Sequence, residues 1–121
     1  MSQWTHIAGI IRLDCIMHVP ERAEIEEIFG EMPVGSEGEC TFSVWENPRR
    51  NDVASRTISI FGDLRDFGGE DVPDIQKWWS QLHNKLEGKP MLIRQAVMEI
   101  CVEYGDIVVL TEEDMEGWEH E

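Results

Sequence analysis

Arginines concentrate in one short part of this chain, residues 47–65, which we call the basic segment. Its four arginines are Arg49, Arg50, Arg56 and Arg65. Only Asp52 and Asp63 oppose them, so the segment is positive in a chain whose net charge is −15. A guanidinium group binds phosphate or carboxylate through two parallel hydrogen bonds, and the nearby Trp45 offers a stacking surface. The pattern predicts a site for an anionic ligand or an acidic partner.

A second interpretation of the basic segment has equal weight. The chain contains 25 acidic residues, and exposed arginines often pair with carboxylates of their own protein. In that case the four arginines neutralise neighbouring acids and bind nothing else. Both interpretations stay open at the level of the sequence.

Acidic residues dominate the rest of the chain and form a second candidate surface. Five of them fall within residues 21–31: Glu21, Glu24, Glu26, Glu27 and Glu31. Such a track can imitate the phosphates of a nucleic acid and occupy the groove of a protein that binds DNA or RNA. The net charge of −15 argues against direct contact with nucleic acid or an anionic membrane, because both require a basic surface.

No catalytic or metal-binding motif is found in the sequence. It contains no G-x-S-x-G, phosphate-binding loop, H-E-x-x-H or dinucleotide-binding pattern. The four histidines are not at ligand spacing, and Cys15, Cys40 and Cys101 lie in apolar runs without C-x-x-C spacing, which is typical of reduced, buried thiols. We therefore expect no enzyme activity, no metal and no cofactor.

Local patterns predict five strands and two helices. The strands are expected at residues 4–15, 40–46, 56–62, 91–104 and 107–111. Apolar and polar residues alternate in the first four, and the last strand follows a predicted hairpin turn. The helices are expected at residues 20–29 and 73–87, each with a proline near its start and a glycine after its end. In the second helix, the residues spaced for burial are Ile75, Trp79, Leu82 and Leu86.

The order of these elements is β-α-β-β-α-β-β, which predicts an α+β fold. Short connections and right-handed crossovers favour a ferredoxin-like split β-α-β sandwich, with a mainly antiparallel sheet and both helices on one face. Gly105-Asp106 is expected to form a two-residue hairpin turn before the last strand. We expect residues 1–111 to form a single domain and residues 112–121 an acidic C-terminal tail.

The chain resembles the small accessory proteins of bacteriophages and other mobile elements in its size, its acidity, its single domain and its lack of a catalytic motif. The resemblance implies a phage-encoded protein that acts by binding. No apolar run is long enough to span a membrane, and the N-terminus lacks the order of a secretory signal. Both points predict a cytoplasmic location, which is the host cytoplasm for a phage protein.

Two binding functions compete. In the first, the protein inhibits a host defence protein or nucleic-acid-binding protein through its acidic surface. In the alternative, it sequesters an anionic, nucleotide-like signalling molecule in a pocket built from the four arginines and Trp45, which two copies of a homodimer can share. The partner is accordingly a host protein or an anionic small molecule.

Overall fold

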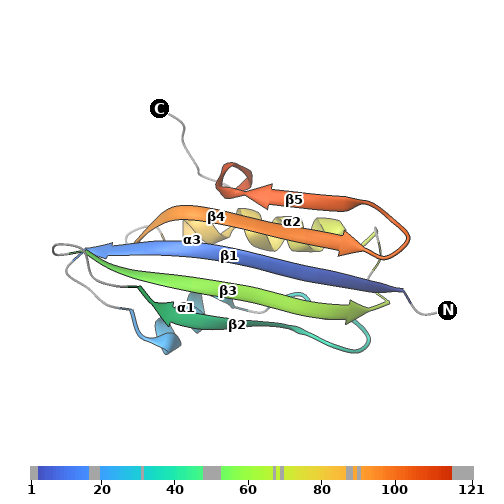
Figure 1. The fold of residues 1–121 in the computed structure, drawn as a ribbon, viewed down its shortest axis with the longest axis horizontal. Helices are drawn as coiled ribbons and strands as arrows, with labels where there is room; N and C mark the ends of the chain where they lie inside the picture. Colours follow the sequence, from blue (N-terminus) through green and yellow to red (C-terminus); the bar gives the residue numbers. More distant parts are fainter. Residues whose placement is uncertain are drawn as a thin grey trace.

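The protein is built on one five-stranded antiparallel sheet with the strand order β2-β3-β1-β4-β5 (Figure 1). The structure is a computed structural model that describes residues 3–16, 20–30, 32–47, 53–66, 68, 70–86, 89 and 91–115. The strands are β1 (Trp4–Ile16), β2 (Cys40–Glu46), β3 (Val53–Arg65), β4 (Met91–Val102) and β5 (Ile107–Thr111). The predicted α+β class and antiparallel sheet are confirmed.

The helices lie behind the sheet in Figure 1. They are α1 (Arg22–Phe29), α2 (Val72–Ser80) and α3 (Leu82–Leu86), and a short 3-10 helix, η1 (Glu112–Asp114), follows β5. Their buried side chains join those from one face of the sheet in a single hydrophobic core. The other face of the sheet, which we call the open face, has no helix over it among the described residues.

The second predicted helix is divided into α2 and α3 at Gln81, where the sequence predicted one continuous helix. The backbone N–H of Gln81 bonds to the carbonyls of Trp78 and Trp79, which tightens the chain locally. The predicted apolar stripe survives this break. Its four members, Ile75, Trp79, Leu82 and Leu86, are all buried, as predicted.

The connection from β4 to β5 is longer than the two-residue turn that Gly105-Asp106 predicted. β4 ends at Val102 and β5 begins at Ile107. Tyr104 takes the left-handed conformation with φ of 61°, and the N–H of Gly105 bonds to the carbonyl of Val102. The turn closes on Val102 through this bond, so residues 103 and 104 leave the strand.

Two indole N–H groups connect the helices to the rest of the core. Trp78 donates to the carbonyl of Phe29 at 2.7 Å, and Trp79 donates to the carbonyl of Thr111 at 2.8 Å. Each bond satisfies a polar atom that would otherwise be buried without a partner. They therefore hold α2 against the end of α1 and the end of β5.

The chain after β5 turns back toward the core. Thr111 caps η1 through its side chain, and Met115 is buried among the core residues. Residues 112–115 of the predicted acidic tail are thus part of the folded structure, and residues 116–121 lie outside the described residues. None of the helices that the structure describes has the length and hydrophobicity needed to cross a membrane.

Candidate binding surfaces

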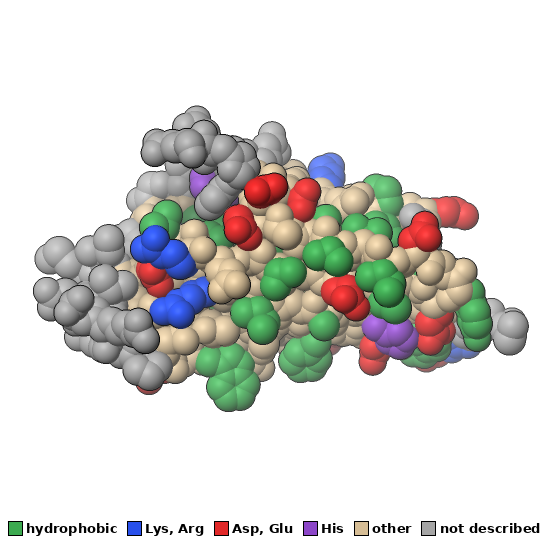
Figure 2. All heavy atoms as spheres, turned by 45° about the horizontal axis from the view of Figure 1, so that its top comes forward, with side chains coloured by type: hydrophobic (Ala, Val, Ile, Leu, Met, Phe, Trp, Pro, Cys, Tyr) green, Lys and Arg blue, Asp and Glu red, His purple; other side chains and the backbone are tan. Residues whose placement is uncertain are grey.

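The open face carries most of the large apolar side chains that are exposed among the described residues. Side chains alternate between the two faces of a strand, so the neighbours of each core position point outward. The large apolar residues exposed here are Ile10, Trp45, Phe61, Leu92, Val97, Ile107 and Val109. Figure 2 shows hydrophobic side chains spread over the middle of this face. Exposed apolar patches are typical of interaction surfaces.

A shallow hollow of about 470 Å³ lies at the centre of the open face. Its walls come from three neighbouring strands and include Ile10, Phe61 and Val97, with Glu99 as its charged member. Ala8 and Gly9 are small and leave space between the larger side chains. The open face is therefore apolar and slightly concave at its centre.

One end of the open face is basic. Asp14 on β1 accepts hydrogen bonds from Arg94 Nε and Ser55 Oγ, both at 2.8 Å, and lies 3.6 Å from Arg12 Nε. Arg94 reaches it because the register between β1 and β4 shifts after Arg12, a bulge that redirects the Arg94 side chain. Two guanidinium groups around one carboxylate leave this end with a net positive charge.

Asp14 stays ionised in this cluster. Its side chain is only 12% exposed, and the largest single effect on its pKa is desolvation, which raises it. The hydrogen bonds from Arg94 and Ser55 and the charges of Arg94 and Arg12 together outweigh that effect. The pKa of Asp14 therefore lies below its ordinary value.

The opposite end of the open face is acidic. His6 lies between two carboxylates, with Nδ1 at 2.6 Å from Asp63 and Nε2 at 3.0 Å from Glu103. The hydrogen bond to Asp63 is the main reason that the pKa of His6 is raised, and the bond to Glu103 adds to it. The bond from His6 likewise lowers the pKa of Glu103. The group connects the ends of β1, β3 and β4.

The structure does not bring the described arginines of the basic segment together. Arg56 and Arg65 are nine positions apart on β3, which corresponds to about 30 Å along a strand. They also occupy positions of opposite parity, so their side chains leave opposite faces of the sheet. Arg49 and Arg50 lie outside the described residues.

Both of these arginines are paired within the chain. Arg56 is buried, and it donates to Glu46 Oε1 at 3.1 Å and to the carbonyl of Ser55 at 3.0 Å. Arg65 pairs with Glu37. An anionic ligand at either position would have to displace a carboxylate or share the guanidinium group with it.

Trp45 belongs to the open face. Its side chain is largely exposed, and its indole N–H donates to Ser59 Oγ at 3.0 Å. Arg56 leaves the neighbouring strand toward the opposite side of the sheet. Trp45 and Arg56 therefore do not line one common pocket.

The predicted acidic track follows α1, although only part of it is described. Glu21, Glu26 and Glu27 are exposed and Glu24 is half-buried. Glu31 lies outside the described residues. Arg22, the one cation of this helix, is 3.0 Å from Glu26 and also lies over the ring of Phe42. We call the exposed glutamates of this region the α1 acidic surface.

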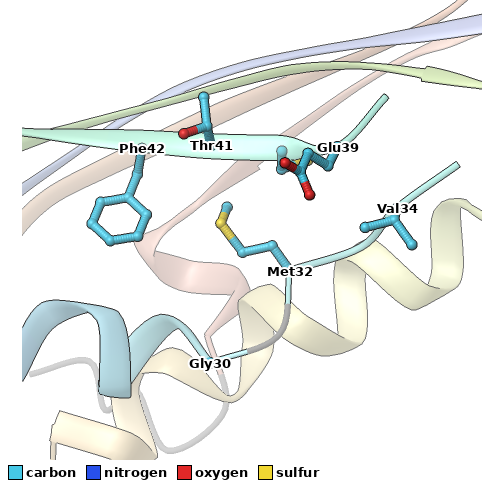
Figure 3. Close-up of a pocket in the computed structure, with 7 residues that line it drawn as sticks. Gly30, Met32, Val34, Glu39, Thr41 and Phe42 are labelled. Carbon is cyan, nitrogen blue, oxygen red and sulfur yellow. The ribbon is translucent and has the colours of Figure 1, made fainter. Parts of the chain in front are cut away.

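A crevice beside α1 separates the end of this helix from the edge strand β2 (Figure 3). It encloses about 470 Å³ and is lined by Gly30, Met32, Val34, Glu39, Cys40, Thr41 and Phe42. Burial and the charge of Glu39 raise the pKa of Cys40 to about 11. The Cys40 thiol therefore stays protonated at neutral pH and is a poor nucleophile.

Among the residues that the structure describes, no group of three or more His, Cys, Asp or Glu side chains is arranged to hold a metal ion. Comparison with known protein families, with curated proteins and with solved structures finds no significant match to this chain.

Sequence reasoning missed both charged ends of the open face. The signal was present in β1, where His6, Arg12 and Asp14 occupy alternate, outward positions of a strand. Their partners come from β3 and β4, far away in the sequence. Only the strand order brings these residues together.

Proposed function

We propose that this protein is a non-enzymatic inhibitor that binds a host protein through the α1 acidic surface, in the cytoplasm of the host cell. The partner has a basic surface of the kind that holds nucleic acid. The observation that carries the proposal is the charge of α1 and its cap: four glutamates, at positions 21, 24, 26 and 27, against the single cation Arg22.

The remaining charges support this assignment. Each of the five described arginines forms an ion pair with a carboxylate of the chain. The positive charge is thus distributed among local pairs, while Glu21 at the N-cap of α1 and Glu27 on the helix remain exposed. A negative surface attracts a basic partner over roughly 10 Å at moderate salt, which raises the association rate and disfavours acidic partners.

A displacement experiment tests the proposal. Proteins from a bacterial extract are bound to DNA immobilised on cellulose, and the purified protein is then added at about 50 mM and at about 200 mM salt. We expect it to release particular nucleic-acid-binding proteins at the lower salt, and to release less of them at the higher salt because exposed charges are screened. Mass spectrometry identifies what is released.

Two matched variants decide whether α1 is responsible. Glu21→Gln, Glu26→Gln and Glu27→Gln together remove three negative charges and keep side chains of similar helix propensity. The control variant removes three exposed negative charges elsewhere through Glu70→Gln, Asp106→Asn and Glu113→Gln. Release lost in the first variant and kept in the control supports the proposal. No release by the wild-type protein, or equal release by both variants, contradicts it.

The alternative function, sequestration of an anionic nucleotide-like molecule, has less support. Its pocket requires the basic segment to converge, and Arg56 and Arg65 lie at opposite ends of β3 with carboxylate partners. Native mass spectrometry of the protein purified from its own cells tests it directly. A retained nucleotide that disappears in the Arg49→Ala, Arg50→Ala double variant would favour sequestration over inhibition.

We also propose that the fold is ferredoxin-like, as the sequence predicted. The support comes from the strand order: β3 lies between β1 and β2, β1 lies between β3 and β4, and helices occur in both connections. Such interleaving is the pattern of two split β-α-β units, to which β5 adds an edge strand. An experimental structure with right-handed crossovers in both units would test the assignment.

A further inference from the structure

We infer that the open face is covered by a second copy of this chain, with the two sheets packed face to face and their strands running in opposite directions. This inference concerns a different face of the molecule from the α1 acidic surface and does not depend on the proposed function. Three properties of the open face support it: its area, its apolar centre and the arrangement of charge at its ends.

The area of the open face matches the requirement of a stable dimer. Five strands spaced about 4.8 Å apart make the sheet about 24 Å wide, and the nine residues from His6 to Asp14 span about 30 Å. Because β2 has seven residues and β5 five, the area of the face is about 600 Å², at the lower end of the roughly 600–1,000 Å² that each partner contributes to a standard interface. A second sheet of the same size covers the whole patch.

The centre of the open face is suited to pack against another sheet. The strand register defines rows across it, and the rows through Ala8 and Ile10 lie in the middle. The large apolar residues in these two rows are Ile10, Phe61, Val97 and Val109. A twofold axis that passes between the two rows brings the Ala8 row of one copy against the Ile10 row of the other copy. This contact removes the four apolar side chains from water.

Charge selects the relative direction of the two copies. One end of the open face has Arg12 and Arg94 around Asp14, and the other has Asp63 and Glu103 around His6. With antiparallel copies, the basic end of each sheet lies over the acidic end of the other. With parallel copies, like charges would lie over like charges, which disfavours association.

The net charge of −15 on each copy does not prevent this contact. At physiological salt the screening length is about 8 Å, so charges on the helix side of the molecule act only weakly across the interface. The charges closest to the interface are Glu99 beside the central hollow and the groups at the two ends of the open face. At the two ends the antiparallel arrangement is complementary.

Sedimentation velocity of the full chain at physiological salt tests the dimer. The test variant combines Ile10→Thr and Val97→Thr, which remove apolar surface and keep β-branched side chains. The control is Val34→Thr, which changes an exposed apolar residue that lies outside the sheet. Circular dichroism and thermal unfolding verify that each variant is folded.

We expect a concentration-dependent dimer whose Kd rises at least about tenfold in the test variant and stays unchanged in the control. A wild-type protein that remains monomeric at about 100 µM, where a dimer of micromolar Kd is populated, overturns the inference. A dimer of equal affinity in the test variant overturns it as well, because the interface would then lie elsewhere.

A cross-linking experiment tests the direction and does not depend on the apolar variants. In the antiparallel arrangement the row of Arg12 lies over the row of His6 of the second copy. Gln95 is in the first row and Cys101 is in the second, so Gln95 of one copy lies over Cys101 of the other. Packed sheets are about 10 Å apart. We therefore expect the Gln95→Cys variant to form covalent dimers with a bismaleimide of about 10 Å span.

The wild-type protein is the control, because its two Cys101 residues are separated by three rows, or about 20 Å along the strands. Within one chain, positions 95 and 101 are equally far apart, so an internal cross-link does not compete. Cross-linking of the variant alone supports the antiparallel dimer. A dimer that the reagent does not trap in the variant, or traps equally in the wild type, overturns the arrangement.

Discussion

Replacement of Asp14 provides the sharpest test of how the open face is built. In Asp14→Ala, Ser55 loses the acceptor of its hydroxyl group, and Arg12 and Arg94 lose the carboxylate between them. The Nε of Arg12 is already buried without a hydrogen-bond partner. The substitution therefore leaves the Ser55 hydroxyl group without its acceptor and Arg12 and Arg94 without the carboxylate between them.

The expected loss follows from these contacts. A hydrogen bond to a charged acceptor contributes about 1.5–3 kcal/mol when it is shielded from water, which applies to the bond from the buried Ser55. Arg94 is 61% exposed, so its ion pair with Asp14 adds only about 0.2–1 kcal/mol. We expect Asp14→Ala to lower the free energy of unfolding by about 2–4 kcal/mol.

Urea denaturation of the monomeric protein, at a concentration well below any dimer Kd, measures this loss. The Arg94→Gln variant is the control and should lose about 1 kcal/mol or less, because only the exposed ion pair is removed. The pKa of Asp14 is lowered on folding, so its contribution is present above the ordinary pKa of about 3.9 and disappears as the pH falls through the lowered value. A loss below about 0.5 kcal/mol at pH 7, or a difference between wild type and variant that does not shrink in acid, would refute the reasoning.

Two further predictions concern stability. Leu82→Ala should lower the free energy of unfolding by about 2–5 kcal/mol in urea denaturation, because Leu82 is buried beneath the sheet; a loss typical of surface positions would contradict this. The pKa of His6 is raised by Asp63 and Glu103, so its stabilising effect is complete below its unfolded pKa of about 6.5 and is lost as the pH rises through the raised value. Thermal unfolding measured at a series of pH values should therefore show the wild type losing stability relative to His6→Gln as the pH rises from about 6.5 through the raised pKa. If the stabilities of the two proteins change with pH in the same way, the two carboxylates do not hold the imidazole ring.

Local periodicity predicted most of the elements because each pattern is completed within a few residues. The hairpin predicted from Gly105-Asp106 placed β5 at Ile107 to Thr111, which are the bounds in the structure, although the turn itself is longer. The buried stripe of the second helix was equally clear, since Ile75, Trp79 and Leu82 recur at helical spacing and all lie in the core. The break at Gln81 left no comparable signal, because the apolar spacing continues across it.

The candidate site was harder to predict because residues that are close in the sequence can lie far apart along an extended strand. The arginines of the basic segment are close together in the sequence. In the extended strand β3, however, Arg56 and Arg65 are about 30 Å apart and lie on opposite faces of the sheet. Conversely, His6 and Glu103 are 97 positions apart and in contact. Their contact depends on the pairing of β1 with β4, which no local pattern encodes.

The two proposed surfaces are compatible because they lie on different sides of the molecule. The helices cover one face of the sheet, so a dimer joined through the open faces would carry a helix layer on each outer side (Figure 1). Each copy of the α1 acidic surface would then remain accessible, and one dimer would present two of them. When the partner has several binding sites, binding of the first acidic surface of a dimer holds the second one near another site. The effective concentration for the second contact is then higher, although no new contact residue is added. Under these two proposals the open face would serve association of the copies, and the α1 acidic surface would serve recognition of the partner.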